Sequence, residues 1–416
     1  MNSTTTMKWT SSLSVAARPE EALAEVLAEL KSKLAGMRPD IAFLFVSPKH
    51  RAAYTQIAAT VLKQLSPRHV LGCSGGGIIG GGREAEQSPA LSVSAVSMPN
   101  VEFHPIRIED ANLPDLDSGP KAWQQLIGLK TDAATGNEQD TPQFILLADP
   151  FSIRVEDMLA GFDFAYPQSV KVGGLASGAR SAGQNALYLD DHTYNDGAVG
   201  LALSGDVRID PLVAQGCRPL GKLMSVTRCQ RNLLIELDKR RALDVMGELI
   251  GQADEHERDL IRHTSLFLGL VMDPFKKGTP GPGDFLIRNL LGMDEKRGVL
   301  AVGGILREGQ NVQFHLFDAS AASDDLSAVL RRYSTERLNA SKGEALPSPP
   351  RGALLFSCLG RGERLYGHPN HDSDAFRAQL GDVPLAGFFC NGEIGPVSGT
   401  TYVHGYTSCF GIFRTK

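Results

Sequence analysis

A cysteine and an arginine three positions apart are the first residues of this sequence that could support chemistry. They lie in Cys358-Leu359-Gly360-Arg361, which follows an apolar run. A guanidinium close to a thiol favours the thiolate, which is the nucleophilic form of cysteine. Two interpretations stay open. Cys358 and Arg361 form a reactive or ligand-binding pair, or the thiol fills space in the core and the arginine pairs with an acid.

A lone carboxylate between glycines is the second candidate. The segment Cys390-Asn391-Gly392-Glu393-Ile394-Gly395 follows another apolar run. Glycines on both sides of a carboxylate let a partner approach the backbone closely. We therefore predict that Glu393, together with Cys390 and Asn391, contacts a ligand and holds a cationic group or acts as a base. The alternative is a turn carboxylate that accepts hydrogen bonds from nearby amides.

A glycine-rich segment, Cys73-Ser74-Gly75-Gly76-Gly77, is the third candidate. It precedes neither a Gly-Lys-Ser/Thr sequence nor a helical pattern, so we expect no phosphate-binding loop. The same lack of a helix argues against an esterase, although Gly72-x-Ser74-x-Gly76 has the spelling of a nucleophile elbow. We predict a hairpin connection at Cys73, Ser74 and Gly75 whose amides can bind a small carboxylate.

Metal-ligand residue types occur in His368-Pro369-Asn370-His371-Asp372. Their spacing matches no familiar zinc site, so we expect no metal and no other cofactor. We predict instead that Asp372 caps a helix from Ser373 to Leu380.

Four apolar strand-like runs end at glycines and divide the chain into similar segments. Each glycine, at Gly72, Gly173, Gly303 and Gly387, lies 24 to 30 positions after the end of an earlier apolar run. Helical patterns such as Pro19–Leu34 occur between or beside the runs. We predict four strand-helix-strand units, two in each of two related halves. The expected fold is α/β (α+β), with mixed or antiparallel sheets flanked by helices.

Composition restricts the class of protein. The chain has 416 residues, 42% of them hydrophobic and 21% charged, and a net charge of -5. We therefore expect no nucleic-acid partner, and no apolar run is long enough to span a membrane. The six cysteines form no Cys-x-x-Cys pair, which favours a reducing compartment. The first ten residues lack the apolar core of a secretory signal. We predict a cytoplasmic protein, and a short transit segment stays open.

Several of these motifs resemble one known family. Gly72-Cys73-Ser74-Gly75-Gly76, Asp196-Gly197-Ala198-Val199-Gly200 and Gly216-Cys217-Arg218-Pro219-Leu220-Gly221 resemble the N-terminal half of the FIST family. Phe356-Ser357-Cys358-Leu359-Gly360-Arg361-Gly362 and Gly387-Phe388-Phe389-Cys390-Asn391-Gly392-Glu393 are similar to its C-terminal half. We predict a FIST N-terminal-like domain over residues 20–225 and a C-terminal-like domain over 226–416, with the change of halves near Cys217.

The resemblance implies a stand-alone sensory module that binds small polar metabolites, amino acids among them, and acts through a signalling partner. We expect the ligand in a cleft between the halves, with Glu393 holding its cation and Arg361 its anion. Two other functions stay open. One is a thiol-dependent enzyme using Cys358 or Cys390, and the other is a protein-interaction scaffold.

Overall fold

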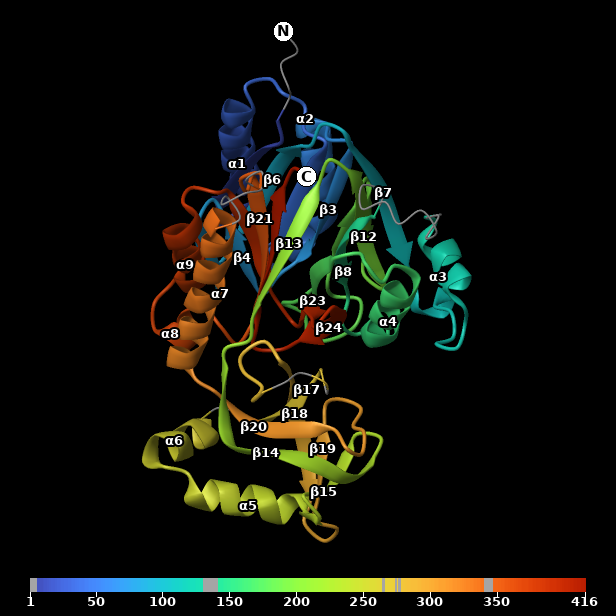
Figure 1. Cartoon of the computed structure of the whole chain (residues 1–416). Helices are drawn as coiled ribbons and strands as arrows, with labels where there is room; N and C mark the ends of the chain where they lie inside the picture. The colour runs from blue at the N-terminus through green and yellow to red at the C-terminus, as the bar shows by residue number, and fades with distance from the viewer. Residues whose placement is uncertain (1–5, 130–140, 264–265, 274, 276–277, 340–346) are drawn as a thin grey trace. The chain divides into compact units, whose positions relative to one another are not determined.

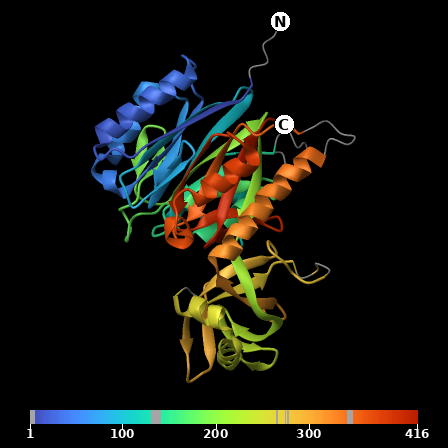
Figure 2. The same ribbon diagram turned by 90° about the vertical axis from the view of Figure 1, so that its left-hand side faces the viewer.

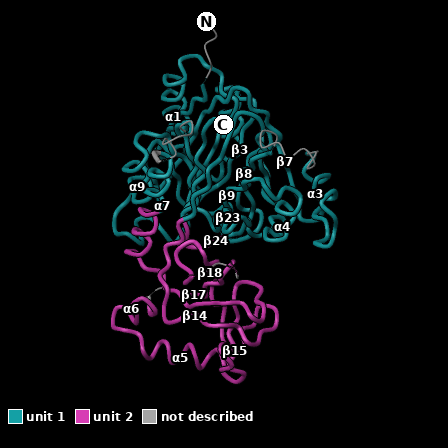
Figure 3. Tube along the Cα trace, in the orientation of Figure 1, with its two compact units in different colours: residues 1–213, 329–403, 408–416 teal, residues 214–328, 404–407 magenta. Residues whose placement is uncertain are grey.

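The chain forms two compact units, which are described separately (Figure 3). The computed structural model describes residues 6–129, 141–263, 266–273, 275, 278–339 and 347–416. Unit 1 consists of residues 1–213, 329–403 and 408–416, and unit 2 of residues 214–328 and 404–407. The chain enters unit 2 at Ala214, close to the change of halves expected near Cys217. The domain boundary between residues 225 and 226 stays a prediction.

Unit 1 is built on three six-stranded sheets. Across the first sheet the order is β1 (Lys8–Ser14), β6 (Leu91–Ser97), β2 (Ile41–Val46), β3 (His69–Ser74), β10 (Leu187–Leu189), β11 (His192–Tyr194). Across the second it is β24 (Thr400–His404), β23 (Glu393–Val397), β9 (Lys171–Leu175), β8 (Gln143–Ala148), β12 (Ala198–Gly205), β7 (Val101–Ile108). Across the third it is β13 (Arg208–Ala214), β25 (Ser408–Arg414), β21 (Gly352–Cys358), β22 (Leu385–Cys390), β4 (Gly77–Gly80), β5 (Arg83–Glu86).

Helices cover the outer faces of these sheets (Figures 1 and 2). They are α1 (Pro19–Leu34), η1 (Pro48–Ala53), α2 (Tyr54–Leu65), η2 (Asp110–Asn112), α3 (Pro120–Ile127), α4 (Val155–Ala165), α8 (Glu363–Tyr366), α9 (His371–Leu380). A further helix, α7 (Ala319–Asn339), has residues 319–328 in unit 2 and the remainder in unit 1. The predicted range of α1 is confirmed, and its apolar stripe packs with α2 on the first sheet. In α9, Phe376 stacks on Phe410 of the third sheet, with ring centroids 5.5 Å apart.

The inner faces of the three sheets share one hydrophobic core. Phe45 of the first sheet stacks on Phe388 of the third, with ring centroids 5.2 Å apart, and Ile145 of the second belongs to the same cluster. Alternate residues of each strand point inward, and the intervening residues face the helices. The predicted mixed α/β class, with mixed sheets flanked by helices, is confirmed.

One strand arrangement occurs three times in unit 1. The pairs β2–β3, β8–β9 and β21–β22 are parallel, and a third strand lies antiparallel beside the first of each pair. A hairpin from another repeat then completes each sheet. The hairpin β10–β11 pairs with β3, β23–β24 with β9, and β4–β5 with β22. This cyclic exchange interlocks the three repeats.

Three hinge glycines occupy equivalent positions in the parallel pairs. A Cβ atom on Gly72, Gly173 or Gly387 would lie 1.8 Å from the carbonyl oxygen of the opposed leucine. The opposed leucines are Leu44, Leu146 and Leu355. A glycine is therefore required at each of these positions, because any side chain would overlap the neighbouring backbone.

The third predicted unit, which ends at Gly303, is wrong. In unit 2, β17 (Leu266–Val271) is followed by an antiparallel strand, β18 (Phe285–Asp294), and a Gly/Pro-rich segment takes the place of the expected helix. A Cβ on Gly303 would have its nearest neighbour 3.5 Å away, so this glycine is no close-approach hinge. The remaining elements of unit 2 are β14 (Cys217–Gln230), β15 (Leu233–Leu237), β16 (Arg240–Arg241), α5 (Ala242–Gln252), α6 (Glu255–His263), β19 (Val299–Val302), β20 (Asn311–Phe317).

Pairing of β14 with both β20 and β15 closes six strands of unit 2 into a ring. Within the described residues of the whole chain, no helix combines the length and the hydrophobicity that crossing a bilayer requires.

The substitution Gly387→Ala tests the hinge. We expect it to lower the free energy of unfolding by roughly 3 kcal/mol or to prevent folding, because strands β21 and β22 would have to separate. Gly247→Ala is the control, since no atom lies within 4 Å of the added Cβ in α5. This control should stabilise by about 0.5–1 kcal/mol. Urea unfolding measures both, and equal stability of the two variants would contradict the close-approach explanation.

Candidate functional site

The strands that carry the hinge glycines meet at their carboxyl ends. The backbone N–H of Ser177 donates to the carbonyl of Ser74 at 3.1 Å, and that of Asn391 donates to the carbonyl of Leu175 at 3.0 Å. These are equivalent contacts, since Ser74 and Leu175 each lie two positions after a hinge glycine and both donors lie four positions after one. The ends of β3, β9 and β22 are thereby joined in a ring.

The third contact of this ring contains a hydroxyl group. The N–H of Gly76 donates to Ser177 Oγ at 2.8 Å, and Ser177 Oγ donates to the carbonyl of Phe389. The serine side chain thus bridges the two backbone groups that repeat symmetry would otherwise pair directly. This bridge is the point at which the three repeats are not equivalent, and it gives the N–H of Gly76 and the carbonyl of Phe389 a hydrogen-bond partner each.

The predicted residues on β3 are buried beside this ring. Cys73 is fully buried in the central core, where burial raises the pKa of its thiol well above the usual value. Ser74 Oγ donates to Asn185 Oδ1 at 3.3 Å and accepts from the N–H of Ala186 at 3.1 Å. Gly75 is also buried, and a side chain there would collide with Phe388. Their role in ligand binding stays a prediction.

The predicted residues on β21 and β22 come together at the ends of these strands. Cys358 and Cys390 face each other in the parallel register. Cys390 Sγ lies 3.3 Å from Glu393 Oε1 and 3.3 Å from the carbonyl oxygen of Ser357. Glu393 and Cys390 are fully buried, Cys358 is half-buried and Asn391 is exposed. The structure therefore brings together Cys358, Cys390 and Glu393, while their contact with a ligand stays a prediction.

Arg361 is fully buried and pairs with Asp372, as the second interpretation of this arginine expected. Its Nε and Nη2 atoms each donate to Asp372 at 3.1 Å. Asp372 also accepts hydrogen bonds from the hydroxyl groups of Ser357 and Ser408. Burial alone would raise the pKa of Asp372, but Arg361 and these hydrogen bonds hold it below the usual value. The predicted capping role of Asp372 is wrong, because it lies inside α9 rather than at the N-cap, Asn370.

Two further carboxyl groups, from the exchanged strand β5, bond backbone amides of the helices near this ion pair. Glu84 Oε1 accepts from the N–H of Ser373 at 2.7 Å, and Glu86 Oε1 accepts from the N–H of Glu363 at 2.8 Å. Burial, and next the negative charge of Asp372, raise the pKa of Glu84 to about 8. A buried neutral carboxyl group thus joins the β4–β5 hairpin to α9. Among the described residues, no group of three or more His, Cys, Asp or Glu side chains is placed to hold a metal ion.

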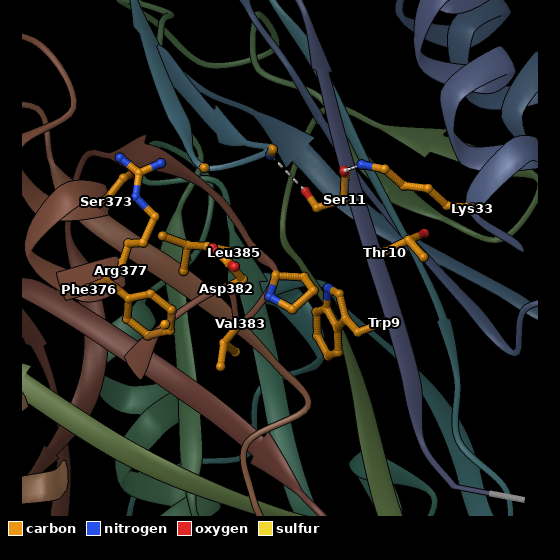
Figure 4. A pocket seen from close by; sticks show the side chains of 14 residues that line it. Trp9, Thr10, Ser11, Lys33, Ser373, Phe376, Arg377, Asp382, Val383 and Leu385 are labelled. Carbon is orange, nitrogen blue, oxygen red and sulfur yellow. Dashed lines mark hydrogen bonds between the residues drawn. The ribbon is translucent and has the colours of Figure 1, made fainter. Parts of the chain in front are cut away.

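A groove of about 380 Å³ lies in unit 1 beside this network (Figure 4). Its lining combines charged, hydroxyl and aromatic side chains with backbone: Trp9, Thr10, Ser11, Lys33, Gly81, Gly82, Ser373, Phe376, Arg377, Gly381, Asp382, Val383, Pro384, Leu385. The volume falls within the range of small-molecule sites. None of the eight residues predicted from the sequence as ligand contacts lines this groove.

The walls of the groove come from distant parts of the chain. The edge strand β1 and Lys33 of α1 form one side, where Lys33 Nζ donates to the carbonyl of Ser11 at 3.2 Å. The opposite side is α9 with Arg377, and the β4–β5 turn lies between them. Both turn residues, Gly81 and Gly82, have positive φ angles of 56° and 74°, which suit a tight hairpin. The N–H of Gly81 donates to Ser11 Oγ at 3.1 Å.

Sequence reasoning missed this groove for an identifiable reason. Residues 8–14, which form β1, have little of the hydrophobic character that marks a strand. Asp382-Val383-Pro384 precedes a predicted strand and carried no motif. The three glycines after Ile79 were the available signal, since a tight turn brings backbone amides close to any neighbouring ligand.

The fold and the groove define a mixed α/β protein whose interlocked three-sheet unit carries a groove of small-molecule size. Two family models match consecutive parts of the chain. The FIST N domain matches residues 40–240 and the FIST C domain matches residues 242–396. The chain therefore belongs to the FIST family, as its motifs predicted. FIST domains are generally associated with small-ligand sensing.

Relatives of similar length occur in mycobacteria. The chain is 34% identical over 402 residues to the uncharacterized protein MT0656 of Mycobacterium tuberculosis (strain CDC 1551 / Oshkosh), which covers 96% of this chain and 98% of the relative. It is 33% identical over 393 residues to the uncharacterized protein Mb0898c of Mycobacterium bovis, covering 94% and 95%. The chain is also 33% identical over 102 residues to an F-box/LRR-repeat protein of Arabidopsis thaliana, and this match covers 23% of this chain and 17% of that protein.

Among solved structures, the chain resembles a cyanuric acid hydrolase at 9% identity and a TM-score of 0.34, over 99% of this chain and 100% of the other. A second cyanuric acid hydrolase, from A. caulinodans, gives a TM-score of 0.36 at 9% identity, over 99% of each chain. Similarities at these TM-scores support no conclusion about this chain.

The substitution Ser177→Ala tests the bridging hydroxyl. It removes the link between Gly76 and Phe389, so we expect a loss of about 1–3 kcal/mol in the free energy of unfolding. Thr60→Ala is the control, because Thr60 Oγ1 bonds only the carbonyl of Gln56 on the exposed face of α2. Its effect should stay within about 0.5 kcal/mol. Chemical unfolding compares them, and a Ser177→Ala protein as stable as the control would contradict the bridge.

The substitution Glu84→Gln tests the buried carboxyl group. Since the pKa of Glu84 is about 8 in the fold and 4.5 in the unfolded reference, the folded chain retains a proton that the unfolded chain releases. Stability from this group is present below pH 4.5 and is lost as the pH rises to about 8. In the variant, the free energy of unfolding should depend less on pH in this range, and the difference from the wild type should be about 5 kcal/mol at most.

Urea midpoints measured between about pH 5 and pH 8.5 test this expectation. Glu363→Gln, an exposed carboxylate on α8, is the matched control and should keep the fall. Parallel pH profiles for the wild type and Glu84→Gln would show that Glu84 is ionised in the fold.

Proposed function

We propose that the chain is a sensory protein that binds a small metabolite carrying both an amino and a carboxyl group, and that the groove holds this ligand. The observation that carries the proposal is the presence of both signs of charge around one cavity of ligand size. Lys33 and Arg377 supply positive charge from opposite walls, and Asp382 supplies negative charge. A zwitterionic amino acid presents the complementary pair of groups.

The neutral part of the lining fits the same ligand. Trp9 and Phe376 give the groove apolar surface for a side chain. Ser373, Thr10 and the glycine turn offer polar groups that can fix the orientation of the ligand backbone. Arg377 is paired with Asp374 at 2.6 Å and Lys33 with Glu29 at 2.6 Å, so each cation lies beside a carboxylate of its own helix at the groove.

We further propose a cytoplasmic location and a protein partner that responds to the bound ligand. All six cysteines lie among the described residues and none forms a disulfide there, and a reducing compartment would keep them as thiols. The association of FIST domains with sensing supports the existence of a downstream partner.

Ligand binding is tested by a thermal-shift screen of the twenty amino acids, followed by calorimetry of each hit. A ligand that binds only the folded state should raise the melting temperature. Asp382→Asn and Arg377→Gln should each weaken binding about tenfold or more, because each removes one charge-assisted contact. Asp191→Asn and Arg18→Gln, which neutralise exposed charges elsewhere, are the matched controls and should bind like the wild type.

Two outcomes would contradict the placement of the ligand. If both groove variants bind a hit with unchanged affinity and Glu393→Gln abolishes binding, the ligand occupies the strand ends that the sequence predicted. If no amino acid shifts the melting temperature, the proposed ligand class is wrong.

A further inference from the structure

The three repeats carry different residues at one pair of equivalent positions. Three residues after the leucine that faces each hinge glycine lie Ser47, Asp149 and Cys358. Three residues after the hinge glycines lie Gly75, Ala176 and Cys390. The first two repeats thus place no nucleophilic pair at the strand ends, and the third places two thiols there.

Ser47 and Asp149 have structural partners. Ser47 Oγ accepts from the N–H of Ala90 at 2.9 Å, and Asp149 accepts from Asn185 Nδ2 at 2.8 Å and from the hydroxyl of Ser152. Both side chains are fully buried. The third repeat therefore differs from its neighbours in chemistry and in access to solvent.

The two thiols are placed to form a disulfide. Cys358 and Cys390 are register partners on adjacent parallel strands, so their side chains leave the same face of the sheet. Adjacent strands are about 4.8 Å apart, which lies within the Cα–Cα range of disulfides. The N–H of Leu359 donates to the carbonyl of Cys390 at 3.1 Å, which continues the ladder beyond the pair and holds it in register.

The surroundings give the two thiols different roles. Cys358 is half-buried, so it can be reached from solution, and it interacts electrostatically with Arg361, which is ion-paired with Asp372. Cys390 is fully buried, and burial together with the carboxylate of Glu393 raises the pKa of its thiol well above the usual value. An oxidant from solution therefore meets Cys358 first, and Cys390 waits as a protonated thiol.

We propose that Cys358 and Cys390 form a dithiol site that reduces hydroperoxides. The Cys358 thiolate attacks the outer peroxide oxygen, the O–O bond breaks, and the products are a Cys358 sulfenic acid and an alkoxide or hydroxide that takes a proton from water. Cys390 sulfur then attacks the Cys358 sulfur, an S–S bond forms, and the sulfenic oxygen leaves as water. Overall, two thiols lose two electrons and two protons, and one peroxide is reduced.

Glu393 is the residue that moves a proton in this reaction. Cys390 Sγ donates its hydrogen bond to Glu393 Oε1 at 3.3 Å, so the carboxylate is in place to accept the thiol proton as the S–S bond forms. That proton leaves with the sulfenic oxygen as water. Exchange with two equivalents of a small thiol restores the dithiol.

Equimolar hydrogen peroxide, followed by thiol counting and peptide mass spectrometry under non-reducing conditions, tests the proposal on the full chain. We expect the loss of two thiols and one cross-link, between the peptides that contain Cys358 and Cys390. Cys358→Ser should retain every remaining thiol. Cys390→Ala, which keeps a small apolar group in the core, should stop at a Cys358 sulfenic acid that dimedone traps.

Two more variants separate chemistry from structure. Glu393→Gln should slow disulfide formation on the order of a hundredfold and prolong dimedone trapping at Cys358, without slowing the first oxidation. Cys229→Ser, which removes a half-buried thiol of unit 2, should behave like the wild type.

Three results would overturn the proposal. They are a peroxide-treated chain that keeps all its thiols, a cross-link that involves other cysteines, and a Cys390→Ala protein that yields no Cys358 sulfenic acid while its circular dichroism matches the wild type.

Discussion

The close approach of two parallel strands, made three times, is the constraint on which unit 1 depends. At each hinge the second strand comes so near the first that a Cβ would lie 1.8 Å from a carbonyl oxygen, and only glycine can occupy the position. This approach brings the carboxyl ends of β3, β9 and β22 within hydrogen-bonding reach of one another. The exchanged hairpins then lock the repeats, because each sheet is incomplete without strands from another repeat.

The three repeats are equivalent in backbone and different in chemistry. Ser177 replaces one direct backbone contact of the ring by a hydroxyl bridge, and Cys358 and Cys390 place thiols where the other repeats have Ser47 with Gly75 or Asp149 with Ala176. The buried pair Arg361–Asp372 also belongs to the third repeat. A repeated scaffold can carry one specialised copy in this way, since the remaining copies supply the packing that holds it.

The groove and the buried charges share one set of elements. Strand β5 brings Glu84 to the first turn of α9, where it accepts a hydrogen bond from the N–H of Ser373. Ser373 also lines the groove, and so does Arg377 from the next turn of the same helix. A buried carboxyl group with a raised pKa is tolerated because it accepts a backbone hydrogen bond and stays protonated. The position of the groove wall thus depends on a polar network in the interior.

Local sequence patterns were enough to predict many of the helices and strands of this protein and its fold class. The amphipathic stripe of α1 and the glycines after apolar strands predicted these elements and the α/β class. The motifs around Gly72 and Gly387 resembled the family that the family models then showed. The same pattern gave a wrong prediction at Gly303, because the sequence around a glycine after an apolar run is the same whether or not another backbone passes close to it. Only the tertiary structure decided which hairpin completes which sheet, that Arg361 meets Asp372, and that Trp9, Arg377 and Asp382 surround one cavity. Those contacts join residues far apart in the chain, and they arise from packing of whole sheets and helices rather than from the sequence around each residue.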